Sequence, residues 1–372
     1  MALLDKLKFA PQKKLLAIDG GGIRGVITLQ VLARFESILR EAKAEGKPNF
    51  RLADYFDYIG GTSTGAIIAA ALAIGMSVAE ISHFYDTGAR EMFTRAGNLK
   101  RFRYMYVDEK LSALLRGVFG AETTLGSDKL KTLVMTILRN ATTDSPWPLS
   151  NNPCAKYNDR SLPDCNLNLP LWQLIRASTA APTYFPPERV RVGAQEFLSV
   201  DGGATTYNNP AFQLFLMATL DPFQLRWRTG EDKLLLVSVG TGIAPVERAT
   251  LRPEDMTLLY NADRIPAALM FASSNEQDFL CRTFGNCLAG PLLDNEVGDM
   301  RGDRSFGQSK LFTYLRYNAD LSEKGLLKSL GLSGIRPENV QCFDSVGHMA
   351  ELKQIGRVVA DTQVRVEHFS GF

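Results

Sequence analysis

Gly61-Thr62-Ser63-Thr64-Gly65 lies between two apolar runs, Tyr55-Phe56-Asp57-Tyr58-Ile59 before it and Ala66-Ile67-Ile68-Ala69-Ala70-Ala71-Leu72 after it. This order predicts a strand, a sharp turn and a helix, with Ser63 at the apex of the turn. Glycine fits on both sides of such a serine because a side chain there would collide with the neighbouring strand and helix. Ser63 is therefore the candidate nucleophile, and the amide of Thr64, the next residue, is a candidate donor to the oxyanion that forms when the serine attacks a carbonyl.

A glycine-rich loop lies upstream of this turn. Lys14-Leu15-Leu16-Ala17-Ile18 predicts a short buried strand, Asp19-Gly20-Gly21-Gly22-Ile23-Arg24-Gly25 follows it, and residues 26–43 have a helical pattern. Backbone N–H groups at the mouth of a helix bind anions. We therefore expect an oxyanion hole in this loop for the carbonyl that the serine attacks. Its candidate donors are Gly20, Gly21 and Gly22.

The same loop also fits a second interpretation. Gly20-x-Gly22-x-x-Gly25 matches the G-x-G-x-x-G pattern of dinucleotide-binding folds. Asp19 argues against that function because its carboxylate would lie beside the pyrophosphate, and no Walker A lysine follows a glycine run. Arg24 has two candidate roles, a contact with a substrate phosphate and a structural ion pair.

A serine nucleophile needs a base, which is normally a histidine. The chain has three histidines, and His83 falls inside a helical pattern, whereas His348 or His368 could complete a Ser…Asp…His order. Asp201 is the better partner. It ends the strand pattern of residues 196–200 and starts the glycine turn Asp201-Gly202-Gly203, so we expect its carboxylate at the same sheet edge as the serine turn.

These three motifs, in this order, resemble the patatin-like phospholipase family. Further similar stretches are residues 172–185, Tyr207-Asn208-Asn209-Pro210, and the strand pattern of residues 234–239 with the Gly240-Thr241-Gly242 turn after it. The resemblance runs from Lys13 to Gly242. It implies an α/β fold of three layers with a mostly parallel central sheet, and a serine lipid acyl hydrolase that uses a Ser63–Asp201 dyad without histidine, cofactor or metal.

The resemblance also sets the expected mechanism and its alternatives. Asp201 accepts the Ser63 proton, and the acyl-enzyme passes its fatty acid to water. Because an aspartate ionises below a histidine, the dyad predicts that activity rises at a lower pH than a histidine base would give. The same dyad could instead transfer the acyl group to an alcohol. Some bacterial relatives are lipases switched on by a cyclic nucleotide, and a storage or binding protein is the non-catalytic alternative.

The pattern divides the chain into a catalytic core, residues 13–242, and a mainly helical C-terminal part, residues 243–372, packed on the same domain. We expect residues 252–284 to form a long helix over the sheet or the acyl groove, and residues 140–168 to form a surface loop. Strands are predicted near 14–19, 55–60, 196–200 and 234–239, and helices near 24–43, 64–75, 77–90, 127–139, 170–180 and 209–220.

Composition is typical of an enzyme rather than a nucleic-acid binder. The hydrophobic content is 45%, and the net charge of +2 provides no strong field for nucleic acid. The five cysteines have no metal-ligand spacing, and we see no signal peptide or spanning run. We therefore expect a cytoplasmic protein acting on phospholipid or another acyl lipid. Basic and aromatic residues alternate over residues 99–106, either as a solvated face or as a peripheral membrane contact.

Overall fold

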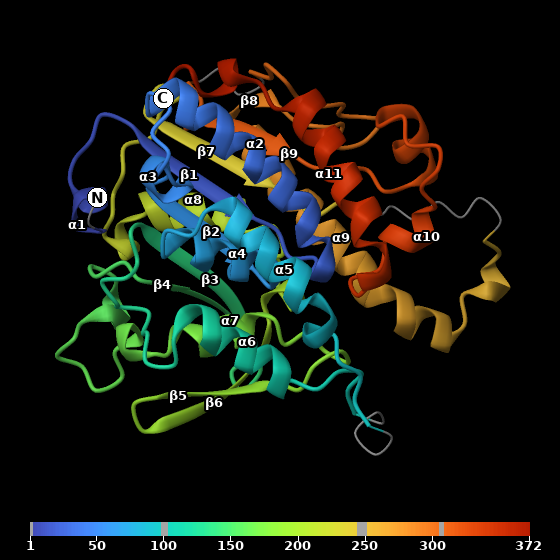
Figure 1. Ribbon diagram of the computed structural model, residues 1–372, viewed down its shortest axis with the longest axis horizontal. Helices are drawn as coiled ribbons and strands as arrows, with labels where there is room; N and C mark the ends of the chain where they lie inside the picture. Colours follow the sequence, from blue (N-terminus) through green and yellow to red (C-terminus); the bar gives the residue numbers. More distant parts are fainter. Residues whose placement is uncertain (1–2, 98–102, 244–250, 305–308) are drawn as a thin grey trace.

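Short runs rich in leucine, valine and isoleucine form the centre of a nine-stranded mixed sheet (Figure 1). The computed structural model describes residues 3–97, 103–243, 251–304 and 309–372. The strand order is β5-β6-β3-β2-β1-β7-β9-β8, and β4 pairs with β3 beside this path. The strands are β1 (Lys13–Ile18), β2 (Tyr58–Thr62), β3 (Leu133–Asn140), β4 (Ser145–Ser150), β5 (Glu188–Val192), β6 (Gln195–Asp201), β7 (Leu234–Val239), β8 (Asn286–Ala289) and β9 (Thr313–Tyr317).

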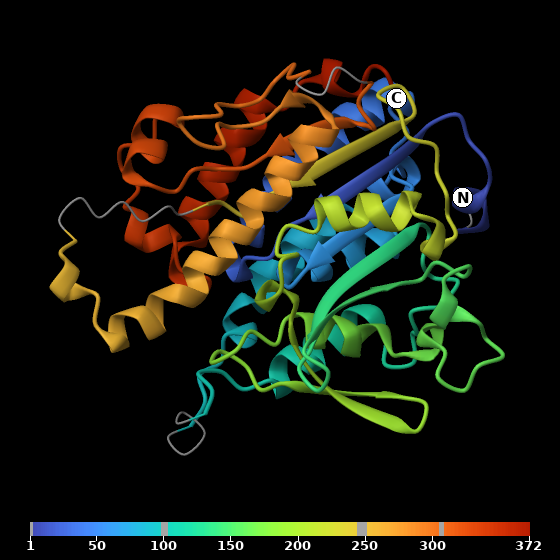
Figure 2. The ribbon, with the colours of Figure 1, turned by 180° about the vertical axis from the view of Figure 1, so that it is seen from behind.

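The sheet is mostly parallel, since only the pairings of β4, β5 and β6 are antiparallel. Helices cover both of its faces and complete a three-layer α/β fold. Figure 1 shows α2, α4, α5 and α11 on one face, and Figure 2 shows α8 and α9 on the other. The helices are α1 (Leu3–Leu7), α2 (Gly25–Lys43), α3 (Leu52–Tyr55), α4 (Thr64–Ala73), α5 (Val78–Met92), α6 (Glu109–Phe119), α7 (Leu171–Ser178), α8 (Ala211–Thr219), α9 (Leu258–Phe284), α10 (Pro337–Val340) and α11 (Met349–Gln363).

The alternation of side chains along a strand divides the core into two halves. In β1, Leu16 and Ile18 pack with the apolar faces of α2, α4 and α11. Leu15 and Ala17 point the other way and pack with α8. Because both faces are covered, these central strands are apolar throughout, as is typical of parallel strands.

The predicted helix at residues 127–139 is wrong, because residues 133–140 form strand β3. Its run Leu133-Val134-Met135-Thr136-Ile137-Leu138 is fully buried on both faces of the sheet. A short run that is apolar on every side has the same composition in a buried strand and in a buried helix. The predicted loop at residues 140–168 is also partly ordered, since it contains β4, which pairs antiparallel with β3.

The C-terminal third of the chain contributes strands as well as helices. β9 pairs in parallel with β7, and β8 extends the sheet beyond β9. The long helix expected over residues 252–284 is confirmed, although it begins at Leu258, where Thr257 accepts the amide of Tyr260 and caps it.

The parallel strands β1, β2 and β7 all end at one edge of the sheet, at Ile18, Thr62 and Val239. The glycine loop, the serine turn and the Gly240-Thr241-Gly242 turn therefore lie side by side at this edge, which is where open α/β sheets place their sites. No helix within the described ranges is both long enough and apolar enough to span a bilayer.

Candidate active site

Ser63 lies at a strained turn between β2 and α4. Its backbone has φ 55° and ψ −124°, a conformation that L-residues rarely adopt. The two flanking glycines make the turn sterically possible. A Cβ on Gly61 would lie 2.0 Å from the carbonyl oxygen of Gly65, and a Cβ on Gly65 would lie 2.2 Å from that of Ile18. The half-buried Ser63 side chain thus stands at the sheet edge.

The Ser63 hydroxyl donates a hydrogen bond to Asp201, with 2.7 Å between Oγ and Oδ2. The other carboxylate oxygen, Oδ1, accepts the amide of Gly203 at 2.7 Å. Asp201 is 4% exposed, and its burial raises its pKa to about 6, against the opposing effects of Ser63, Gly203 and Arg176. At pH 7 the carboxylate is thus mostly ionised and more basic than an exposed aspartate.

The pairing of strands that places Asp201 beside Ser63 differs from the one that the sequence predicted. The strand that Asp201 ends, β6, runs antiparallel to β3, so the rule for carboxyl ends of parallel strands does not place it. β6 overlaps only the last three residues of β3 and stops opposite Leu138. The neighbouring Ile137 pairs with Thr62, the residue before the serine. This register brings the two motifs together.

A residue to which the sequence assigned no role, Ser178, holds the nucleophile from behind. It is fully buried at the end of α7, where its Oγ accepts the amide of Ser63 at 2.9 Å and donates to the carbonyl of Ile137 at 2.6 Å. The Ser63 amide is therefore committed and cannot hold an oxyanion. Ser178 lies within the 172–185 stretch, but only the fold reveals its partners.

We expect Ser178→Ala to lower kcat about tenfold, which corresponds to ~1.4 kcal/mol of barrier, with a smaller change in KM. The reason is that the alanine leaves the Ser63 amide without a partner and frees the turn that aims the hydroxyl. Steady-state assays would measure kcat and KM, and the rate of fluorophosphonate labelling would measure the reactivity of Ser63. A lowered melting temperature with unchanged kcat and labelling rate would limit Ser178 to a role in stability.

The glycine loop lies directly beside the nucleophile, since a Cβ on Gly20 would be 3.3 Å from the Ser63 Cβ. The amide of Gly20 is already used, because it donates to the carbonyl of Asn208 at 3.0 Å. The amides of Gly21, Gly22 and Thr64 have no acceptor among the described residues. The glycine loop and the serine turn thus provide three uncommitted donors, and Gly20 is not one of them.

Arg24 points into the protein rather than into the site. Its Nη1 donates to the carbonyl of Gln341 at 3.1 Å, and its guanidinium lies 4.6 Å from the ring centre of Phe343. Burial lowers its pKa to about 10. Within the described ranges no carboxylate lies at ion-pair distance from it, so the structure does not show the ion pair suggested by the sequence. Arg24 instead holds the 341–343 segment on the glycine loop, where Ile23 N–H donates to Phe343.

Asp19, the first residue of the loop motif, forms a buried ion pair with Arg316 of β9. The two guanidinium nitrogens lie 2.9 and 2.6 Å from the two carboxylate oxygens, and Nη1 also donates to Ser238 at 2.7 Å. On the far side of Arg316 lies Asp278 of α9, which pairs with Arg282 at 2.8 Å. This chain of charges connects the glycine loop to the C-terminal third of the protein.

The three histidines lie away from the dyad. His83 is exposed, His348 contacts Glu351 at 3.2 Å, and His368 contacts the Tyr317 hydroxyl at 2.7 Å. None of them hydrogen-bonds to Ser63 or Asp201, whose protein partners are given above.

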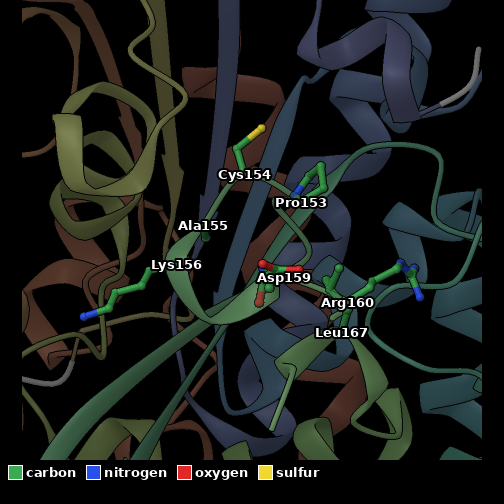
Figure 3. Close-up of a pocket in the computed structure, with 8 residues that line it drawn as sticks. Pro153, Cys154, Ala155, Lys156, Asp159, Arg160 and Leu167 are labelled. Atoms are coloured by element: carbon green, nitrogen blue, oxygen red, sulfur yellow. The ribbon is translucent and has the colours of Figure 1, made fainter. Parts of the chain in front are cut away.

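Two cavities lie outside the dyad. One of about 500 Å³ follows β4, and Figure 3 shows Lys156 and Arg160 at its wall pointing in different directions. It lies near the start of β3, at the edge opposite to Ser63. The other, of about 480 Å³, adjoins the 341–346 segment. It is lined by Arg90, Phe93, Arg95, Tyr106, Glu338, Cys342, Asp344, Ser345, Val346 and His348. In the described part of the chain, no three His, Cys, Asp or Glu side chains are grouped to hold a metal ion.

Only part of the basic and aromatic segment at residues 99–106 can be placed, since residues 98–102 lie outside the described ranges. Tyr106 is buried, stacks on Tyr184 and hydrogen-bonds to Asp344. Met105 is exposed.

Comparison with known proteins gives one family. A family model described as "Patatin-like phospholipase" matches residues 16–215. A curated relative from Vibrio cholerae, named cGAMP-activated phospholipase, is 31% identical over 214 residues, covering 54% of this chain and 56% of its own length. Patatin-17 from Solanum cardiophyllum is 30% identical over 250 residues, covering 61% and 60%. The matches thus span less than two thirds of these relatives. The solved structure of VipD from Legionella pneumophila aligns with 92% of this chain and 67% of its own, at 14% identity and a TM-score of 0.40.

Proposed function

Because the chain belongs to the patatin-like phospholipase family, we propose that it hydrolyses the fatty acyl esters of lipids through a Ser63–Asp201 dyad. The observation that carries this proposal is the 2.7 Å hydrogen bond from a serine on a strained strand–helix turn to a buried aspartate. Such a pair contains both parts that acyl transfer requires, a positioned nucleophile and a base in contact with its proton.

The reaction begins when the Ser63 oxygen attacks the ester carbonyl and its proton passes to Asp201 Oδ2. The negative oxygen of the tetrahedral intermediate is received by the free amides of Gly21, Gly22 and Thr64, each contributing roughly 3 kcal/mol to the lowering of the barrier. Asp201 returns the proton to the leaving alcohol, which leaves an acyl-serine. A water molecule then gives its proton to Asp201 and attacks the acyl-serine. Asp201 passes that proton to the Ser63 oxygen as the ester bond breaks, and the fatty acid is released.

We expect wild-type protein to release fatty acid from a mixed phospholipid extract and to be labelled at position 63 by a fluorophosphonate probe. The Ser63→Ala variant should neither release fatty acid nor be labelled. Mass spectrometry of the products measures the release, and mass spectrometry of the peptide that contains position 63 measures the labelling. Turnover of any ester by the alanine variant at the wild-type rate would remove Ser63 from the mechanism. Adding an alcohol to the same assay separates hydrolysis from acyl transfer, because acyl transfer would yield a new ester.

A second candidate, a phospholipase activated by a ligand, is favoured by the cavity beside residues 341–346. Arg90 and Arg95 at its wall make no ion pair within the described ranges, so they are available to an anionic ligand such as a cyclic dinucleotide. The segment forming its other wall holds the glycine loop through Phe343. A curated relative is named for activation by cGAMP. The same assay with and without cGAMP decides between constitutive and activated hydrolysis.

A further inference from the structure

α9 exposes an apolar row in its N-terminal half and packs on the protein through residues that lie mostly in its C-terminal half. At ~100° per residue, positions 258, 265 and 269 fall within about 40° of one another on one side of the helix. Positions 270, 274, 278 and 281 form a second stripe on a different side, which faces the protein. The two stripes thus separate an outward side from an inward side. Figure 2 shows the helix crossing the sheet and extending beyond it.

The inward side contacts the active-site turns. The methyl group of Met270 would lie 3.3 Å from a Cβ on Gly203, whose amide holds Asp201. One turn further, Ser274 accepts a hydrogen bond from the Asn208 side chain at 3.2 Å. The same Asn208 holds the Gly20 amide through its carbonyl. The segment of α9 around Met270 therefore lies beside the turns that hold Asp201 and the glycine loop.

The outward side is apolar where a surface helix is normally polar. Leu258 is 86% exposed, Leu269 62% and Ile265 50%. A soluble surface leaves single apolar residues exposed, but a row of three on one helix face marks a contact with a partner. Further along α9, Glu276 lies on this side, and the exposed apolar side chains there, Phe279 at 42% and Phe284 at 39%, are less exposed. The most exposed apolar residues of the helix are thus those of its N-terminal half.

We propose that this row, Leu258, Ile265 and Leu269, is the surface with which the enzyme docks on a lipid bilayer, lying in the boundary between head groups and acyl chains. The inference rests on the proposed function, because a lipid ester must leave its bilayer to reach Ser63. Its position supports a bilayer over another partner: the row ends at Leu269, directly before Met270 and Ser274, which contact the active-site turns. Docking thus brings the lipid substrate next to the site entrance.

The test measures binding apart from hydrolysis. In the Ser63→Ala background, which leaves the vesicles intact, full-length protein is mixed with sucrose-loaded phosphatidylcholine vesicles and sedimented. We expect Leu258→Gln/Leu269→Gln to lower the partition coefficient at least about tenfold, since glutamine keeps the length and the helix propensity but not the apolar surface. Binding should persist in 1 M salt, because the attraction is not ionic.

Leu220→Gln/Val366→Gln is the matched control, with two exposed apolar residues at the opposite edge of the molecule. It should bind vesicles as the parent does. In the active enzyme, the α9 pair should lose hydrolysis of vesicle lipid about tenfold and keep turnover of a water-soluble short-chain ester. Circular dichroism checks that all variants are folded.

Equal vesicle binding by the α9 pair and the control pair would overturn the inference. A second result would also overturn it. If wild type did not bind vesicles, and light scattering showed that wild type is a dimer whereas the Leu258→Gln/Leu269→Gln variant is a monomer, the row would be an interface between two copies. Failure of the proposed function would give a different result. Wild type would then hydrolyse no ester, but its binding to vesicles would still depend on Leu258 and Leu269.

Discussion

Asp201→Asn is expected to lower kcat/KM for a lipid ester by about a thousandfold. An asparagine amide can hold the Ser63 hydroxyl in place but cannot accept its proton, and general-base catalysis of this kind contributes roughly 10²–10⁴ in rate. No other base contacts the serine within the described residues, since its side-chain partner is Asp201. Steady-state assays with wild type and variant measure the loss, and circular dichroism shows that the variant is folded.

The histidines are the controls for this result. His348→Ala and His368→Ala, singly and together, should leave kcat/KM within a few-fold of wild type, because neither side chain contacts the dyad. If either substitution were as damaging as Asp201→Asn in a folded protein, the site would be a Ser-Asp-His triad instead.

The same residue sets the expected pH dependence. Asp201 must be ionised to take the proton, and its pKa is raised from 3.8 to about 6 by burial. Activity should therefore fall as the pH drops through about 6 and reach a plateau above it. The sequence predicted that activity would rise at a lower pH than a histidine base gives. The burial of Asp201 corrects this prediction, because it raises the pKa of the carboxylate to about 6. Since a limb near pH 6 is also typical of histidine, the histidine variants, and not the pH profile, distinguish dyad from triad.

Arg316→Met is expected to lower the free energy of unfolding by about 3–5 kcal/mol, the usual loss when one member of a buried ion pair is removed. The variant leaves the buried carboxylate of Asp19 without its guanidinium, and Asp278 loses a neighbouring charge. Urea denaturation measures the difference. Adding Asp19→Asn to Arg316→Met should restore part of the stability, because the asparagine removes the unpaired charge.

Arg189→Met provides the comparison, because Arg189 is exposed and forms a 2.6 Å pair with Glu196. Exposed ion pairs contribute between 0 and about 1 kcal/mol. A loss of less than 1 kcal/mol for Arg316→Met as well would show that the buried pair stabilises the fold no more than an exposed one.

Local patterns predicted the parts of this site that lie within single turns. Gly61 and Gly65 pointed to the serine turn because the steric requirement acts over a few residues. The contacts between distant segments could not be predicted in this way. Ser178 holds the amide of Ser63 across 115 positions, and Arg316 binds Asp19 across 297. A pattern within one segment carries no information on such partners.

The same distinction explains the error at β3. The run Leu133–Leu138 is buried on both faces because helices cover both sides of the sheet. Only that covering removes the alternation by which a strand is recognised.

The ion pair between Asp19 and Arg316 means that the motifs and the folding unit have different boundaries. All the family motifs end by Gly242, yet a recombinant fragment cut there would keep the acidic partner and discard the basic one. It would also discard β9, the strand that covers the open side of β7. The shortest fragment worth expressing must therefore include Arg316, whose guanidinium pairs with Asp19 of the glycine loop. Arg316 lies more than seventy positions beyond the last motif.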